Sequence, residues 1–142
     1  MKTKLIVVVA SIGVLLAALP LLAHHSFMSE YGGGNVSLTG TLVQFDWVNP
    51  HSWAYVEVTD EKTGKKVIWK GETPPINVLF RNGWTKPIVE GLVAKKEKVT
   101  MSGAPAKDGS NHIFASNMTL LSTGTVMGLS GAPPAEDAAP AK

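Results

Sequence analysis

The four histidines are the residues of this chain best suited to chemistry, and they occur at three places in the sequence. His24 and His25 follow an apolar run that ends at Ala23, whereas His51 and His112 lie far downstream. Neutral imidazoles are good ligands for borderline and soft metal ions such as copper and zinc. If export machinery cuts after Ala23, the α-amine and ring of His24 join the ring of His25 in one compact set of nitrogen donors.

Two copper geometries are open, and they depend on the cleavage site. After a cut at Ala23, His24 would chelate the ion through its amine and ring, and one of the two downstream histidines would complete a three-nitrogen site of the histidine-brace kind. After a cut at Leu22, His25 would be the third residue of the mature chain. The amine, two amides and that imidazole would then hold Cu(II) or Ni(II) in a square plane.

Zinc and purely structural roles are the alternatives for the same residues. A zinc ion would take Asp46 or Asp108 as an oxygen ligand. In the structural interpretation, the N-terminal histidine pair docks an arm onto the domain, His51 is a polar residue at a turn and His112 begins a strand.

Residues 1–23 have the layout of a secretory signal peptide. Lys2 and Lys4 precede an apolar run that starts at Leu5, and Pro20 and the small Ala23 stand where a processing site is expected. An uncleaved membrane anchor is the alternative, because the run approaches the ~20 residues that a bilayer requires. We expect cleavage and a periplasmic or secreted protein without stable membrane insertion.

Composition excludes several classes of function. The chain has no cysteine, which removes disulfides, thiolate metal sites and cysteine nucleophiles. Residues 1–23 hold two of the 13 basic residues and none of the 11 acidic ones, so the expected mature chain has no formal net charge. Nucleic acid and anionic membrane surfaces are therefore not expected partners.

The pattern of strands predicts a mainly β fold, a small five-stranded OB-like Greek-key barrel with one short helix between strands 3 and 4. The predicted strands cover residues 36–48, 53–59, 66–71, 98–103 and 113–121. Thr73 is the expected helix cap, Pro74 its first residue, and Asn82-Gly83 its stop, with Ile76, Leu79 and Phe80 facing inward. An immunoglobulin-like sandwich fits less well, because a helix interrupts the strands and the strands are too few.

The predicted domain order is a signal peptide (1–23), an N-terminal arm with a glycine-rich hinge (24–35), the barrel (36–122) and a disordered Ala/Pro-rich tail (123–142). A switch of the apolar parity near Leu42 predicts a bulge in the first strand.

Turn residues predict the register of the first three strands. The Asn49-Pro50-His51-Ser52 turn would pair Val48 with Trp53, and the next hairpin would pair Val58 with Val67 and Val56 with Trp69. Trp47 and Trp69 would then be core residues.

The same register places Trp53 and Tyr55 on the outer face of the sheet. Together with Asn111, in the loop before the last strand, they are the predicted ligand-binding residues, and His24, His25, His51 and His112 are the candidate metal ligands. We therefore expect a noncatalytic exported binding module with an unidentified ligand or protein partner, or alternatively a periplasmic copper-binding protein. No nucleophile with a base and no close carboxylate pair indicates a catalytic residue, and copper-dependent oxidase chemistry is the one enzymatic route that stays open.

The chain resembles a family of secreted bacterial proteins whose domain has no known function. The likeness covers most of residues 23–121 and rests on four segments: His24-His25-Ser26-Phe27, Trp47 to Trp53, Arg81 to Trp84 and Lys107 to Asn111. The resemblance implies export and a small β-rich domain, and carries no reaction, cofactor or partner. Family members commonly have arginine where this chain has His112, which favours His24, His25 and His51 as the general site residues.

Overall fold

The computed structural model describes residues 27–129, and the chain divides into two compact units between Glu30 and Tyr31. Within the described range, the first unit contains only the short helix α2 (Phe27–Glu30). The second unit contains the remaining elements: β1 (Val36–Asp46), β2 (Ser52–Thr59), β3 (Lys66–Thr73), α3 (Ile76–Arg81), α4 (Lys86–Ala94), β4 (Lys98–Pro105), β5 (His112–Leu120) and β6 (Val126–Gly128). Among the described helices, none has the length and apolar character needed to cross a membrane.

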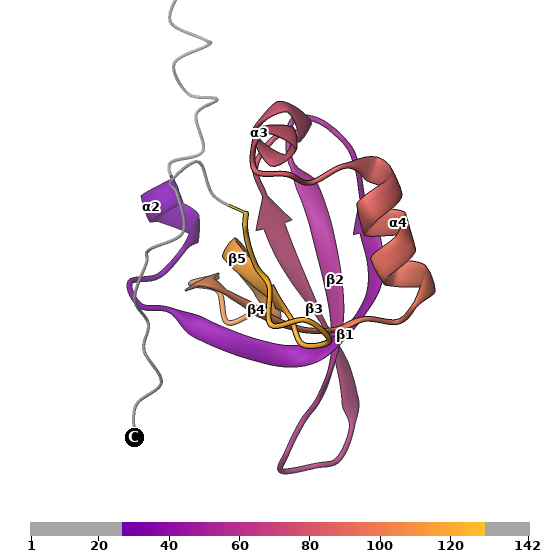
Figure 1. Cartoon of the computed structure of the whole chain (residues 1–142). Coiled ribbons are helices and arrows are strands. Elements are labelled where there is room, and N and C mark those ends of the chain that lie inside the picture. Colours follow the sequence, from indigo (N-terminus) through magenta and orange to yellow (C-terminus); the bar gives the residue numbers. More distant parts are fainter. Residues whose placement is uncertain (1–26, 130–142) are drawn as a thin grey trace, which may run out of the picture. The chain divides into compact units, whose positions relative to one another are not determined.

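Five of the strands close into a barrel (Figure 1). β1 lies between β2 and β4, β2 pairs with β3, and β4 pairs with β5, all antiparallel. Parallel pairing of Lys70–Glu72 in β3 with His112–Phe114 in β5 closes the ring. This connectivity, with helices between β3 and β4, is that of a small OB-like barrel, so the predicted fold class is confirmed.

β1 carries the predicted bulge, but its register with β2 differs from the prediction. The register shifts between Leu42 and Gln44, and Trp53 pairs with Asp46 instead of Val48. The reason is local to the turn, where the Ser52 hydroxyl donates to the Val48 carbonyl over 2.9 Å and closes a loop that replaces the last strand pairs. Because the difference is two residues from Gln44 to Asp46, these side chains keep their predicted faces. Beyond the bulge the difference is three residues, so Leu42 lies opposite Val56 and Val43 is exposed.

The β2–β3 hairpin has the predicted register, with Val58 opposite Val67 and Val56 opposite Trp69. Ala54 and Val56 are buried, whereas Trp53 and Tyr55 are half-buried on the outer face. Figure 1 shows this hairpin projecting from the barrel away from α3.

Two helices, instead of the single predicted one, separate β3 from β4. Thr73 is the last residue of β3 because it continues the ladder opposite Ser52, so it cannot cap a helix, and Pro75 precedes α3 instead. The predicted loop after α3 contains α4, whose cap is Thr85 and whose first turn holds a proline. Phe80, expected to face inward, is 65% exposed.

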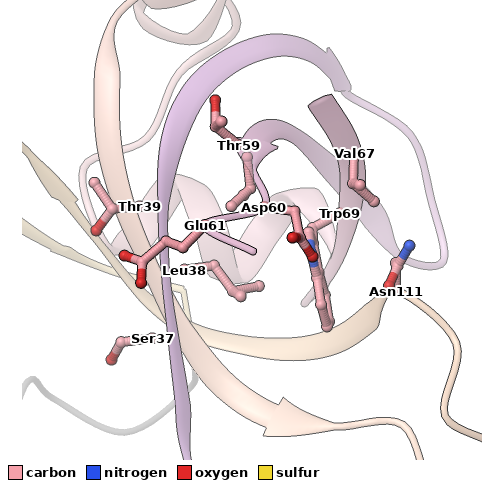
Figure 2. A pocket seen from close by; sticks show the side chains of 10 residues that line it. Ser37, Leu38, Thr39, Thr59, Asp60, Glu61, Val67, Trp69 and Asn111 are labelled. Carbon is pink, nitrogen blue, oxygen red and sulfur yellow. The ribbon is translucent and has the colours of Figure 1, made fainter. Parts of the chain in front are cut away.

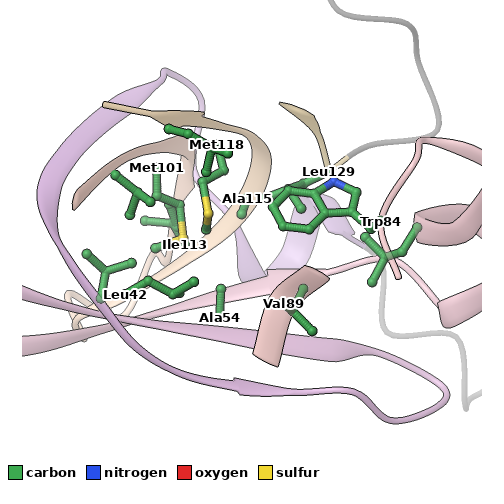
Figure 3. Packing of buried hydrophobic residues seen from close by; sticks show 13 residues of the cluster. Leu42, Ala54, Trp84, Val89, Met101, Ile113, Ala115, Met118 and Leu129 are labelled. Atoms are coloured by element: carbon green, nitrogen blue, oxygen red, sulfur yellow. The ribbon is translucent and has the colours of Figure 1, made fainter. Parts of the chain in front are cut away.

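The core fills the barrel interior and extends under the helices (Figure 3). Trp84, predicted to lie in a loop, is fully buried, and its indole Nε1 donates to the Gly128 carbonyl over 2.9 Å. Trp47 and Trp69 pack against the core but remain partly exposed, so the prediction that both are core residues holds only in part.

The ordered chain continues past the predicted end of the domain. β6 lies in the segment predicted to be a disordered tail, yet it pairs with β5, and Leu129 after it is fully buried. The apolar residues of this segment cover the core beside Trp84, which explains why it is part of the domain. Residues 130–142 lie outside the described range.

Candidate functional site

Glu72, near the end of β3, is the centre of a cluster of polar side chains. Its side chain is only 14% exposed. One carboxylate oxygen, Oε1, lies 2.8 Å from Nδ1 of His51. The other, Oε2, accepts a hydrogen bond from the Tyr31 hydroxyl and lies 3.8 Å from Nε2 of His112. The fold therefore gathers groups from three other segments around one carboxylate.

One edge of the His51 ring lies against the protein, and the opposite edge faces solvent. Nδ1 is enclosed, whereas the side chain as a whole is 42% exposed, so the accessible part of the ring is the part that carries Nε2. The separation from Glu72 is that of a hydrogen bond, but the ring is turned away from the bonding direction, and Nδ1 has no hydrogen-bond partner among the described residues. A rotation of the ring would align the two groups.

His112 lies among aromatic rings at the start of β5. Its ring centroid is 5.1 Å from that of Trp53 and 5.4 Å from that of Tyr31, and the Tyr31 hydroxyl is 3.0 Å from Nε2. Phe114 packs on the other edge of Tyr31 at 5.5 Å. Trp53, predicted as a ligand-binding residue, therefore contacts a predicted metal ligand, with the two rings tilted by 39°.

Tyr31 fixes the end of the N-terminal arm at this cluster. It is 3% exposed and forms an isolated β-bridge with Ala106, and the next residue, Gly32, donates its amide proton to the Pro105 carbonyl over 2.7 Å. His25 and His24, six and seven residues earlier in the sequence, lie outside the described residues.

The three predicted ligand-binding residues do not line one cavity. The Tyr55 hydroxyl donates to Asp46 over 2.8 Å, which is a contact separate from the Glu72 cluster. Asn111 lines a groove near the β2–β3 hairpin that includes neither Trp53 nor Tyr55 (Figure 2). Burial and the neighbouring Asp46 raise the pKa of Tyr55.

The two aspartates considered as oxygen ligands for zinc have other partners. Asp46 accepts hydrogen bonds from Gln44 and Tyr55. Asp108 accepts the Ser110 amide, and hydrogen bonds from Ser110, followed in size by the charge of nearby His112, lower the pKa of its carboxyl. Across residues 27–129, no group of three or more His, Asp or Glu side chains is arranged to hold a metal ion.

Sequence reasoning missed Glu72, and it considered Tyr31 only as a hinge residue or as part of an arm docked onto the barrel. The predicted β2–β3 register, extended by three pairs beyond Val56 and Trp69, places Glu72 opposite Trp53, as observed. The signal for Glu72 was therefore available, but the predicted strand ended at Gly71. Tyr31 lies in a segment read as a flexible hinge, and only the folded domain shows the acceptor for its hydroxyl.

Comparison with known proteins gives one match. The sequence model of DUF6152, described as a family of unknown function, matches residues 11–115, a span that contains all four histidines. Searches of the curated proteins and of the solved structures find no match.

Proposed function

Because this chain belongs to DUF6152, a family of unknown function, its role has to be inferred from the site, and we propose that it is an exported, noncatalytic module that binds a transition-metal ion, copper foremost. The observation that carries the proposal is the pairing of His51 with the enclosed carboxylate of Glu72. Histidines that bind metals commonly give their second ring nitrogen to a carboxylate, which sets the tautomer and the ring orientation.

The half-exposed ring of His51 fits this role. With Nδ1 enclosed beside Glu72, the lone pair of Nε2 is available to an ion from solvent. A buried ring nitrogen without a hydrogen bond costs about 1–3 kcal/mol. An ion that turns the ring while binding Nε2 would align Nδ1–H with the carboxylate and recover this cost.

The N-terminal histidines supply the remaining donors in this proposal. Tyr31 is fixed against Glu72 and His112, and a chain of seven residues reaches at most roughly 23–25 Å. This upper limit permits a meeting of His24 or His25 with His51, and the proposal requires one. If His24 is the mature N-terminus, its amine and ring with His51 give a three-nitrogen set, which suits Cu(II).

An organic ligand on the outer aromatic face has less support. Trp53 packs against His112, the Tyr55 hydroxyl donates a hydrogen bond to Asp46, and Asn111 lines a groove that neither of them lines. The proposed metal site instead contains His51 and Glu72, whose side chains lie 2.8 Å apart.

The test begins with protein purified after export, because its intact mass identifies the first residue. Cu(II) affinity is then measured by competition with a chromophoric chelator. We expect His51→Ala to weaken binding at least tenfold, an extra residue before His24 to do the same, and Glu72→Gln to weaken it about 10- to 100-fold through the orientation of His51.

Glu57→Gln is the matched control, since Glu57 is also a strand glutamate with one basic partner, Lys66, at 2.9 Å. It should leave Cu(II) affinity unchanged. Full affinity in both His51→Ala and the N-terminally extended protein would contradict the proposal.

A further inference from the structure

A groove lies at the part of the barrel where β3 lacks its second neighbour. Pairing with β5 begins at Lys70, so residues 66–69 of β3 pair only with β2 among the described strands. The groove beside them has a volume of about 440 Å³ and is bounded by β1, the β2–β3 hairpin and Asn111. Its size is within the ~300–1,000 Å³ of small-molecule sites.

Side chains that face the barrel interior form the floor of the groove. Leu38 of β1 and Val58, Val67 and Trp69 of the hairpin are partly buried there. In Figure 2, Leu38 reaches from β1 toward the side of the groove that carries Trp69. The open barrel wall thus leaves an indole among aliphatic side chains accessible to a ligand.

Asp60 is a rigidly held acceptor at the rim. Its Oδ1 accepts the amides of Lys62 and Thr63 over 2.9 and 2.7 Å, and the Thr63 hydroxyl over 3.0 Å. No described residue donates a hydrogen bond to Oδ2 of Asp60. The carboxylate is therefore fixed by the turn through one oxygen while the other is available for a donor.

The charges and hydrogen-bonding groups of the rim select one class of ligand. The lining residues include no lysine, arginine or histidine, so nothing offsets the charge of a phosphate or carboxylate ligand. Asp60 accepts hydrogen bonds, the exposed amide of Asn111 both donates and accepts, and the indole offers an apolar face. Hydroxyl groups on an apolar ring complement all three.

We propose that this groove binds a neutral carbohydrate, with one sugar ring stacked on Trp69 and its hydroxyls bonded by Asp60 and Asn111. Glu61 is a second carboxylate of the lining, so a cation is the competing ligand, and it is tested below with putrescine. The groove shares no residue with the Glu72 cluster. The carbohydrate site and the metal site can therefore be tested independently.

Nitrogen–proton correlation NMR of the full exported chain tests the site directly. The four tryptophans give four indole signals, which act as internal controls for one another. The probes are N,N′-diacetylchitobiose and maltotriose. We expect at least one of them to shift the Trp69 indole and the Asn111 side-chain amide in a saturable way, while the signal of buried Trp84 stays in place.

Trp69→Leu should weaken the binding of that sugar about tenfold by removing the stacking face. Asn111→Ala removes an exposed side chain and should weaken it without affecting folding, whereas Asn77→Ala, on the exposed side of α3, should have no effect. If neither sugar gives a saturable shift at Trp69, the proposal is wrong. It is equally wrong if putrescine, a cation, shifts this indole and the sugars do not.

Discussion

The two halves of β3 differ in their neighbours, and this difference separates the two candidate sites. At Lys70–Glu72 the strand is paired on both sides, with β2 and with β5. At residues 66–69 it is paired with β2 alone within the described chain. The closed half gathers Tyr31, His51 and His112 around Glu72, whereas the open half leaves a groove in front of Trp69.

Barrel closure therefore decides which kind of chemistry each half supports. Where three strands meet, side chains distant in sequence are forced together, and polar groups have to satisfy one another. Where the wall is open, interior-facing apolar side chains become accessible to a ligand. Four measurements test this difference between the two halves of β3.

The largest effect is expected from Gly71→Val in the closed half. A Cβ atom at Gly71 would overlap the sulfur of Met101 and lie 3.2 Å from Cβ of Ala115. We expect a loss of about 3 kcal/mol in the free energy of unfolding, because a packed core tolerates added volume poorly. Urea denaturation measures it. Lys70→Val, at the adjacent exposed position, is the control, and equal losses for the two variants would refute the packing difference.

Glu72→Ala should be the next most damaging change. It removes the acceptor of the hydroxyl of Tyr31, a residue 3% exposed, and should cost about 2 kcal/mol. Glu57→Ala, which removes an exposed contact to Lys66 in the open half, should cost less than about 1 kcal/mol. The same denaturation assay compares them. An equal loss of unfolding free energy in Glu57→Ala and Glu72→Ala would show that the Glu72 cluster stabilises the fold no more than the exposed contact of Glu57 does.

Amide exchange should differ between neighbouring positions of β3. The Lys70 amide donates to the Asn111 carbonyl over 2.9 Å. Strand alternation turns the Ile68 amide to the same side, before β5 begins. We expect Ile68 to exchange at least about tenfold faster than Lys70 in hydrogen-exchange NMR. Equal protection would show that the open edge is covered in solution.

The smallest predicted effect is a titration in the hairpin beside the groove. Hydrogen bonds from the Thr63 amide, and then from its hydroxyl, lower the pKa of Asp60 below its ordinary value of 3.8. The folded pKa is depressed, so the stabilisation is present above the unfolded pKa and is lost as the pH falls through the folded one. Thr63→Val should raise the pKa toward 3.8, measured from the carboxyl carbon shift. An unchanged pKa of Asp60 in this variant would show that the Thr63 hydroxyl does not lower it.

The sequence predicted those parts of the fold that depend on local signals. Strand alternation and the hairpin turn predicted the β2–β3 pairing that carries Trp53 and Trp69, and the parity switch predicted the bulge after Leu42. The β1–β2 register failed because a side-chain bond of Ser52 closes the turn, which no residue pattern indicates. α4 was missed although Thr85 and the proline that follows form a helix-start signal.

The candidate site was harder to predict because it depends on barrel closure. His51 and His112 were expected near one another from the loop positions of the fold, and both do contact Glu72. Glu72 itself, and the docking of Tyr31, depend on contacts between residues 41 positions apart. A periodic pattern cannot report such contacts, whereas the pairing of β3 with β5 produces them directly.

Electron paramagnetic resonance of Cu(II) bound to the exported protein shows directly whether His51 is a metal ligand oriented by Glu72. We expect a spectrum with nitrogen couplings from imidazole that changes in His51→Ala and stays unchanged in Glu57→Gln. If the spectrum is identical in the native protein and in His51→Ala, His51 is not a ligand.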